Sequence, residues 1–174
     1  RANIAGVLDH PRFELVEGDL ASLDPVALLD GVERVLHLAG QPGVRASWAD
    51  GFAAYVERNV EVTQRLLEAA REVGVERFAA ASSSSVYGDA ATFPTPETTL
   101  PRPVSPYGVT KLAAEHLCTL YGTNFGVPTV SLRYFTVYGP RQRTDMAIRR
   151  MIDAALRGTT FPLYGDGSAS RSFT

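Results

Sequence analysis

The chain has 174 residues, 45% hydrophobic content and a net charge of -2 at pH 7, which fits one globular unit with a real core. The balanced charge argues against a nucleic-acid surface, and no apolar run approaches the roughly 20 residues that span a bilayer. No charged and then apolar leader opens the sequence, so we expect a cytoplasmic protein with neither nucleic acid nor membrane as partner.

Strand and helix patterns alternate along the chain. In chain order they predict a strand at 13–17, a helix at 24–30, a strand at 33–39, a helix at 51–73, a strand at 77–83, a helix at 107–124, a strand at 128–136, a helix at 145–157 and a strand at 161–164. This alternation favours a doubly wound, parallel α/β sheet with helices on both faces. The proline-rich loop at 89–106 is long enough to form part of a site, although a plain surface connection is the alternative.

Four serines, Ser82–Ser85, follow the apolar strand run Phe78–Ala81. Doubly wound sheets hold their ligands at the carboxyl ends of their strands, so these hydroxyls are candidates for a binding site. The alternative is that they satisfy the backbone of a turn, but four in a row exceed what a turn requires.

A tyrosine and a lysine, Tyr107 and Lys111, stand four residues apart where the next helix begins. Residues at this spacing share a helical face. A phenol has a reference pKa of about 10 and becomes a base near neutrality only when a neighbouring cation stabilises its anion. A solvated pair on a helix surface is the alternative for an isolated Tyr and Lys.

Further motifs recur in order: Gly18-Asp19-Leu20, Leu36-His37-Leu38-Ala39-Gly40, Asn59-Val60 and the segment 132–140. Together with the serines and Tyr107-x-x-x-Lys111, they make the chain similar to the extended short-chain dehydrogenase/reductase family, and to its nucleotide-sugar epimerases in particular. The resemblance runs from about residue 13 to the last residue. It implies a Rossmann-type sheet, an enzyme that uses NAD, and a catalytic set of Ser83, Tyr107 and Lys111.

The resemblance also implies the residues that contact the cofactor and the substrate. Those expected at NAD are Asp19, Leu20, Leu38, Ala39, Gly40, Gln41, Asn59, Tyr107, Lys111 and Phe135. Ordinary core packing is the alternative for Leu38, Ala39 and Phe135. Those expected at the UDP-sugar are Arg45, Ser83, Ser84, Thr136, Arg143 and Arg171. A solvated loop arginine is the alternative for Arg45.

Thr136 followed by Arg143 resembles the UDP-glucuronate 4-epimerases, in which a hydroxyl and a guanidinium hold the uronic carboxylate. The implied reaction interconverts UDP-glucuronate and UDP-galacturonate: Tyr107 takes the C4 hydroxyl proton, a transient 4-keto sugar forms, and hydride returns to its opposite face. The alternatives are a UDP-glucose/galactose-type 4-epimerase, then a nucleotide-sugar dehydratase or decarboxylase, or a non-catalytic dinucleotide-binding relative. Ser84 and Ser85 stand where dehydratases and decarboxylases carry carboxylates, which disfavours that reading.

No glycine-rich phosphate-binding turn is present in the sequence. We therefore expect an internal piece of a protein about twice as long, with residues 1–140 forming a partial NAD-binding domain and residues 141–174 the start of the substrate-binding lobe. This piece alone is expected to be inactive and to bind NAD weakly, whereas the full-length protein is expected to be a homodimer.

Two other residues with reactive side chains are predicted to have structural rather than catalytic roles. Cys118 lies in an apolar helical pattern and is predicted to pack in the core. His37 lies in a strand pattern and is predicted to be a packed or hydrogen-bonded residue rather than a catalytic one. The spacing of the histidines and the cysteine predicts no metal site.

Overall fold

The computed structural model describes residues 2–89, 92–163, 165–167 and 173. The chain divides into two compact units. One, called the sheet unit below, consists of residues 17–134, and the other, called the C-terminal unit, consists of residues 1–16 together with 135–174. The functional division predicted after residue 140 stays a prediction.

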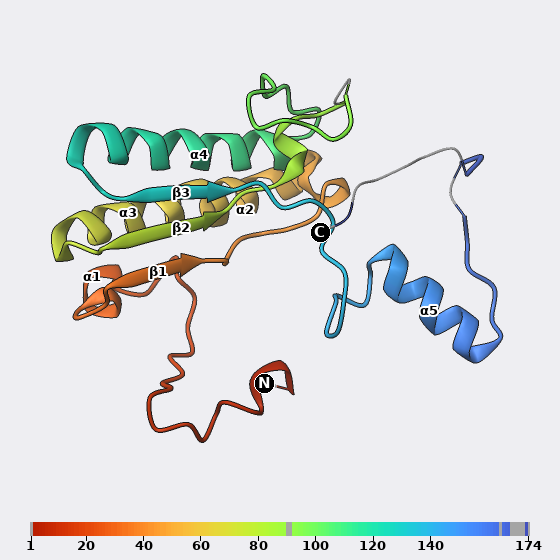
Figure 1. Cartoon of the computed structure of the whole chain (residues 1–174), viewed down its shortest axis with the longest axis horizontal. Coiled ribbons are helices and arrows are strands. Elements are labelled where there is room, and N and C mark those ends of the chain that lie inside the picture. Colours follow the sequence, from red (N-terminus) through yellow and green to blue (C-terminus); the bar gives the residue numbers. More distant parts are fainter. Residues whose placement is uncertain (1, 90–91, 164, 168–172, 174) are drawn as a thin grey trace. The chain divides into compact units, whose positions relative to one another are not determined.

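The sheet unit is built around three parallel strands, β1 (Arg34–His37), β2 (Arg77–Ala81) and β3 (Thr129–Leu132), in the spatial order β1-β2-β3 (Figure 1). Val35 pairs with Phe78, which pairs in turn with Thr129. Each crossover contains a helix, as parallel strands require. The predicted parallel α/β sheet is confirmed.

Five α-helices accompany the strands in the described part of the chain: α1 (Pro25–Leu29), α2 (Phe52–Val56), α3 (Val62–Val73), α4 (Pro106–Phe125) and α5 (Ala147–Arg157). A π-helical turn, Glu57–Glu61, joins α2 to α3, so the helix predicted over 51–73 is continuous but changes its hydrogen-bond spacing partway. Short 3-10 helices cover Ala2–Ile4, Arg45–Ser47, Ala49–Gly51 and Ser84–Val86.

Local sequence signals explain where α1 begins and where α3 and α4 end. Asp24 caps α1 by accepting from the backbone N–H of Val26 at 3.0 Å, and a proline follows it at the first helical position. Gly74 and Gly126 end α3 and α4 in the left-handed conformation that costs glycine little. These signals are short-range, which is why the sequence predicted the helices closely.

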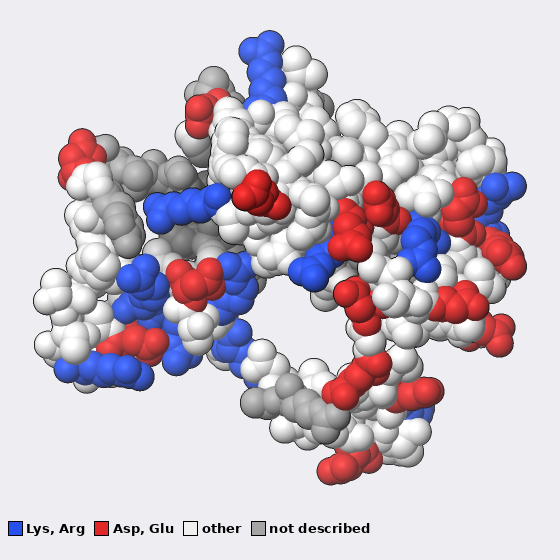
Figure 2. Space-filling model, turned by 180° about the vertical axis from the view of Figure 1, so that it is seen from behind, with Lys and Arg blue, Asp and Glu red and all other residues white. Residues whose placement is uncertain are grey.

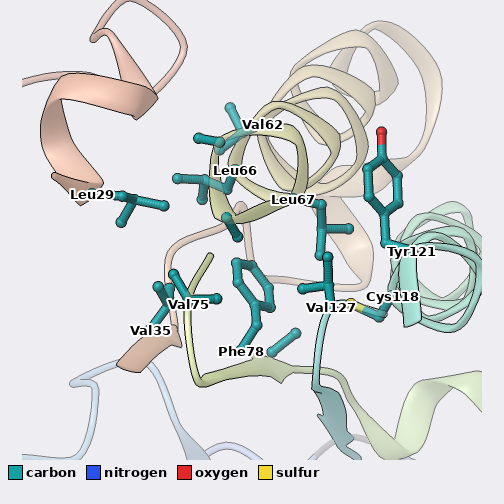
Figure 3. Close-up of a cluster of buried hydrophobic side chains, with 13 residues drawn as sticks. Leu29, Val35, Val62, Leu66, Leu67, Val75, Phe78, Cys118, Tyr121 and Val127 are labelled. Atoms are coloured by element: carbon teal, nitrogen blue, oxygen red, sulfur yellow. The ribbon is translucent and has the colours of Figure 1, made fainter. Parts of the chain in front are cut away.

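The core lies between the sheet and the helices α3 and α4, which run side by side over one face of the sheet (Figure 1). Figure 3 shows Phe78 of β2 beneath Leu67 of α3, with Val127 and Cys118 beside them. Phe78 and Leu67 are fully buried, and Cys118 is 1% exposed, which confirms its predicted packing role. Burying each side chain of this size stabilises the fold by about 1.5–3 kcal/mol.

The opposite face of the sheet is open in the described residues. Leu36 of β1 is 72% exposed, and Val130 and Leu132 of β3 are 39% and 38% exposed. Alternate strand residues point to opposite faces, so Val35 is buried on the helix side while Leu36 is not. The helices predicted on both faces are therefore seen on one face, as an incomplete Rossmann-type sheet would show.

Two predicted strands are wrong. Residues 13–17 form no strand, and Leu15 and Val16 are 41% and 52% exposed. Residues 161–163 also form no strand, and residue 164 lies outside the described residues. An extended apolar run becomes a strand only when a neighbouring strand accepts its backbone hydrogen bonds, and neither segment pairs with the sheet in the described chain.

Candidate active site

The serines after β2 form a short turn whose hydrogen bonds leave the Ser83 hydroxyl proton available. Ser83 caps the 3-10 turn Ser84–Val86, and its Oγ accepts from the Ser85 backbone N–H at 3.1 Å. Because this contact uses a lone pair, the Ser83 O–H can still donate to another oxygen. Ser84 is joined to the segment after β3 through its N–H, which donates to the Tyr134 carbonyl at 2.8 Å.

Tyr107 and Lys111 lie in the first turns of α4. Ser105 caps this helix by accepting from the Gly108 N–H at 3.1 Å, and Pro106 occupies its first position. The half-buried Tyr107 ring packs edge-on against Tyr55, with 6.2 Å between the ring centroids. The helix therefore presents the phenol and the amine on one face, as their spacing predicted.

The Lys111 amine reaches back to the end of β2. Its Nζ donates to the Ala81 carbonyl at 2.9 Å, and the side chain is only 8% exposed. Burial lowers the Lys111 pKa from its usual value, because removal from water disfavours the charged form. The amine thus contacts the residue two positions before Ser83, and Lys111 itself follows Tyr107 by one helical turn.

Glycine makes the close approach between α4 and the serine turn possible. A Cβ on Gly108 would lie 2.6 Å from the Ser85 carbonyl oxygen and 2.9 Å from the Cβ of Pro103. The absence of a side chain at this position lets the first turn of α4 rest against the turn that carries Ser83. The two halves of the predicted catalytic set therefore adjoin within one compact unit.

Asn59 lies in the π-helical turn and joins three segments of the site. Its Oδ1 accepts from the Gln41 N–H at 2.7 Å, and its Nδ2 donates to the Thr110 hydroxyl at 3.0 Å. Thr110 in turn donates to the Tyr107 carbonyl at 2.9 Å. Irregular turns of this kind are frequent at functional sites, and here the extra residue brings a buried amide to the backbone after β1.

Gly40 leaves a small space between these groups. It has φ +158°, and a Cβ there would lie 2.8 Å from Asn59 Oδ1 and 3.3 Å from Lys111 Nζ. Gly40 itself is exposed, so a ligand can approach the backbone beside the buried amine. A side chain at this position would fill the space beside the Lys111 amine and the Asn59 amide, a space that could admit part of a ligand such as a dinucleotide.

His37, on β1, is buried and is connected to Asn59 through Thr63. Thr63 Oγ1 donates to the Asn59 carbonyl at 2.8 Å, so the His37 Nε2–H, 3.0 Å from that oxygen, must be the donor to it. Burial, and then the nearby Lys111 charge, lower the His37 pKa to about 4. The predicted reading of His37 as a hydrogen-bonded residue is confirmed.

The remaining residues predicted at the cofactor have mixed surroundings. Leu38 is 65% exposed, and Ala39 is also exposed, so neither is a core residue. The Gln41 side chain accepts from Arg58 Nη1 at 2.8 Å. Asp19 is exposed and accepts from the Ala21 N–H at 3.0 Å, whereas Leu20 packs partly against the core.

The residues predicted to bind the substrate lie in both units. Arg45 is exposed and begins a 3-10 helix in the sheet unit. In the C-terminal unit, the half-buried Phe135 precedes Thr136, which forms a single parallel bridge with Phe173. Arg171 lies outside the described residues.

The Arg143 guanidinium in the C-terminal unit already binds a carboxylate. Its Nε donates to Asp145 Oδ1 at 2.9 Å and its Nη2 to Asp145 Oδ2 at 2.5 Å, and this pairing lowers the Asp145 pKa. Both side chains are about half exposed or more. Figure 2 shows basic side chains gathered over this unit around α5, and all of them are arginines, since the segment from 141 to 157 contains five arginines, two aspartates and no lysine.

Sequence reasoning missed two groups that organise the site. Thr110 lies between Tyr107 and Lys111 in sequence, and its polar side chain on the inward helix face was the available signal. The second is an ion pair between Glu115 and Arg133, which no local pattern could reveal because it joins a helix to the end of a strand.

Within the described residues no helix is long and apolar enough to cross a membrane. In the same part of the chain, no cluster of three or more His, Cys, Asp or Glu side chains could hold a metal ion.

A serine at a strand end of a parallel sheet, with Tyr-x-x-x-Lys at the start of the following helix, defines a protein of the short-chain dehydrogenase/reductase type. The chain belongs to the NAD dependent epimerase/dehydratase family, whose model matches residues 2–174.

The chain is similar to proteins with nucleotide-sugar epimerase names. It is 47% identical over 172 residues to the uncharacterized UDP-glucose epimerase YtcB of Bacillus subtilis (strain 168), covering 99% of this chain and 54% of that protein. A solved structure of UDP-glucuronic acid 4-epimerase from Bacillus cereus, in complex with UDP-glucuronic acid and NAD, matches with a TM-score of 0.94 and 47% identity over 99% of this chain and 55% of that one.

A third similar structure is MoeE5 in complex with UDP-glucose and NAD, with a TM-score of 0.85 and 52% identity over 91% of this chain and 53% of that one. The chain thus spans about half the length of the relatives that it matches.

Proposed function

We propose that the whole protein is an NAD-dependent nucleotide-sugar 4-epimerase that interconverts UDP-glucuronate and UDP-galacturonate. The observation that carries the proposal is the buried Lys111 amine, which lies one helical turn from Tyr107 and against Ala81, at the end of the strand that leads to Ser83. A binding protein that only senses a dinucleotide has no need of such a proton-transfer set.

The residues fit NAD on the side of its nicotinamide ribose. Lys111 and the Asn59 amide face the space beside Gly40, and Gln41, Leu38 and Ala39 continue the exposed edge after β1. Asp19 and Leu20 are proposed to contact the adenine end, and Phe135 to complete the nicotinamide surroundings. When bound, NAD supplies the acceptor and donor of the hydride that leaves and returns to the sugar C4.

The proton chemistry falls to the chain's own side chains. Tyr107 takes the proton of the C4 hydroxyl and later returns it, while Lys111 stabilises the phenolate. Ser83 donates its hydroxyl proton to the same sugar oxygen and holds it near Tyr107. Ser84 and Ser85 cannot readily serve as carboxylate bases, so elimination and decarboxylation are disfavoured.

Thr136 and Arg143 are proposed to hold the carboxylate of the uronic acid, because a planar guanidinium and a hydroxyl donor suit that group. Arg171 is proposed to contact the diphosphate, and Arg45 is proposed to lie near the substrate. The surplus of arginine around α5 favours an anionic substrate of this kind.

A UDP-glucose/galactose-type 4-epimerase is the second candidate. The observation that favours it is the pairing of Arg143 with Asp145. A guanidinium that already binds a carboxylate of its own chain gains less binding energy from the carboxylate of a substrate. The relative MoeE5 has been solved with UDP-glucose and also with UDP-glucuronic acid, so it is in keeping with either candidate.

We also propose that the whole protein is a homodimer, with the outward face of α4 as the contact. Val109 and Leu120 on this helix are 48% and 50% exposed, and Leu120 lines a shallow groove together with Val60, Ala113 and Leu117. The mass in solution, measured by light scattering, tests this proposal.

The first prediction tests the function itself. The whole protein is expected to interconvert UDP-glucuronate and UDP-galacturonate, and Tyr107→Phe is expected to lower kcat by about 10²–10⁴-fold or more while NAD stays bound, because the change removes the base and little volume. Product ratios by chromatography and the bound NAD measured after denaturation provide the two readouts. Turnover within a few-fold of the unchanged protein would show that Tyr107 is not the base.

A further inference from the structure

A buried carboxylate on α4 lies one turn beyond Lys111 and has no place in the proton chemistry above. Glu115 is 8% exposed and accepts from the Ser82 hydroxyl. It also accepts from Arg133 Nε at 2.9 Å and from Arg133 Nη2 at 2.8 Å. Tyr107, Lys111 and Glu115 follow one another at intervals of four residues, so they share one face of the helix.

The Arg133 guanidinium extends the same connection to two further segments. Its Nη1 donates to the Glu97 carbonyl at 3.1 Å, in the proline-rich loop that precedes α4. It also lies over the Tyr87 ring, 4.8 Å from the centroid, just after the serine turn. The hydrogen bonds to Glu115 raise the Arg133 pKa further above its already high value, so this cation is permanent.

These contacts hold the residues that flank Ser83. Lys111 binds the Ala81 carbonyl and Glu115 binds the Ser82 side chain, so α4 holds two consecutive residues immediately before Ser83. The backbone there is held to the neighbouring segment as well, since the Ser82 N–H donates to the Leu132 carbonyl at 2.9 Å. The placement of Ser83 relative to Tyr107 therefore depends on Glu115 and its partner.

We propose that Glu115 and Arg133 are positioning residues of the epimerase reaction: through Ser82 and the Glu97 loop, they hold the Ser83 hydroxyl in line with the Tyr107 phenol. The inference rests on the proposed function. It assigns no contact with substrate to either residue.

The chemistry of the pair explains why a charged, forked contact serves this purpose. A two-point guanidinium–carboxylate contact fixes orientation, whereas a single hydroxyl–amide bond leaves it free to turn. Buried ion pairs cost desolvation and are often no more stabilising than apolar residues of the same size. Their directional geometry is what an apolar replacement cannot supply.

The test compares two variants of the pair with a control in the whole protein. Glu115→Gln keeps an oxygen that can accept from Ser82 but loses the charge, and Arg133→Lys keeps the charge but loses the fork and the bond to Glu97. The control is Tyr121→Phe, which removes two bonds between α3 and α4 away from the site: the Tyr121 hydroxyl accepts from Gln64 Nε2 at 2.9 Å and donates to Glu68. All are assayed well below their melting temperatures, with folding checked by circular dichroism.

We expect kcat for UDP-glucuronate to fall by about 10- to 100-fold in both pair variants, the effect of misplacing a reacting group by about 1 Å, with KM changed little. Tyr121→Phe is expected to lower the melting temperature with kcat unchanged. A lower melting temperature with unchanged kcat in the pair variants would overturn the proposal, as would a rise in KM alone or an equal loss of kcat in the control.

A second readout needs no turnover. Hydrogen exchange followed by mass spectrometry should show faster exchange of the segment 82–87 in Glu115→Gln than in the unchanged protein, and no such change in Tyr121→Phe. If the unchanged protein epimerises no UDP-sugar, the proposed function fails. The positioning proposal fails separately if exchange in this segment is the same in Glu115→Gln as in the unchanged protein.

Discussion

At the scale of single residues, the site depends on how Lys111 is held. Its amine is buried against the Ala81 carbonyl, where a cation can act strongly on a neighbouring phenol because little water screens it. Its pKa is lowered by burial, and the carbonyl contact partly offsets that cost by binding the protonated form. The same position also places it beside Gly40, so one side chain can serve both a base and a ribose.

Arg143 gives the sharpest prediction about the substrate. Arg143→Ala should raise KM for UDP-glucuronate by about 10- to 100-fold, since hydrogen bonds to charged groups contribute about 1.5–3 kcal/mol each, and should change KM for UDP-glucose little. Steady-state kinetics with both sugars on the same variant provide the measurement. Asp145→Asn is the matched control, and it should leave KM for UDP-glucuronate unchanged or lower it. Equal losses for both sugars would favour the neutral-sugar epimerase.

His37 predicts how stability depends on pH. Its pKa falls from 6.5 to about 4 on folding, so between these values the unfolded chain binds more protons and stability decreases as pH falls. The whole shift corresponds to about 3 kcal/mol. Urea unfolding of the 174-residue chain at pH 7 and at pH 4.5 should show a smaller loss in His37→Gln than in the unchanged chain. Equal losses would mean that His37 is already protonated, or is not buried, in solution.

At the scale of elements, α4 organises the site because one of its faces carries Tyr107, Lys111 and Glu115. The helix ends were predictable, since Ser105, Pro106 and Gly126 are local signals. The contact between its first turn and the serine turn was not, because it depends on the backbone of Ser85, which is far away in sequence.

Gly108 provides the prediction for this element. Gly108→Ala favours the helix by up to about 1 kcal/mol, but its Cβ would meet the Ser85 carbonyl at 2.6 Å. The clash should prevail, with a loss of about 1–3 kcal/mol in the free energy of unfolding and a lower kcat in the whole protein. Gly122→Ala on the same helix, where the nearest atom is 3.2 Å away, is the control. Similar unfolding free energies for the two variants, measured in urea, would contradict the close approach.

At the scale of the whole molecule, the 174 residues contain the proposed proton-transfer set and the ribose side of the proposed NAD site, but no glycine-rich phosphate turn. A polypeptide of these residues should therefore bind NAD weakly or not at all, because backbone amides at a helix N-terminus supply most of the hold on the pyrophosphate. Calorimetry of this polypeptide beside the whole protein makes the comparison. Tight binding by the 174 residues would mean that Lys111, Asn59 and Gly40 suffice.

The sequence alone determined the alternation of strands and helices, the ends of the main helices and the candidate set of Ser83, Tyr107 and Lys111. The elements and the Tyr107–Lys111 pair depend on local periodicity, on capping residues and on spacing within one helix, which act over a few residues, whereas Ser83 was assigned through the resemblance of the motifs to a known family. It failed at residues 13–17 and 161–163, where an extended apolar run has no strand beside it in the described chain.

Only the tertiary structure decided how the set is assembled. The contacts that assemble it are the bond from the Lys111 amine to the Ala81 carbonyl, the bond between Gln41 and Asn59 of the π-helical turn, and the ion pair of Glu115 with Arg133. Each of these contacts joins residues 18 to 30 positions apart. Such contacts form only when the sheet and its helices pack, because burial then makes every polar group find a partner.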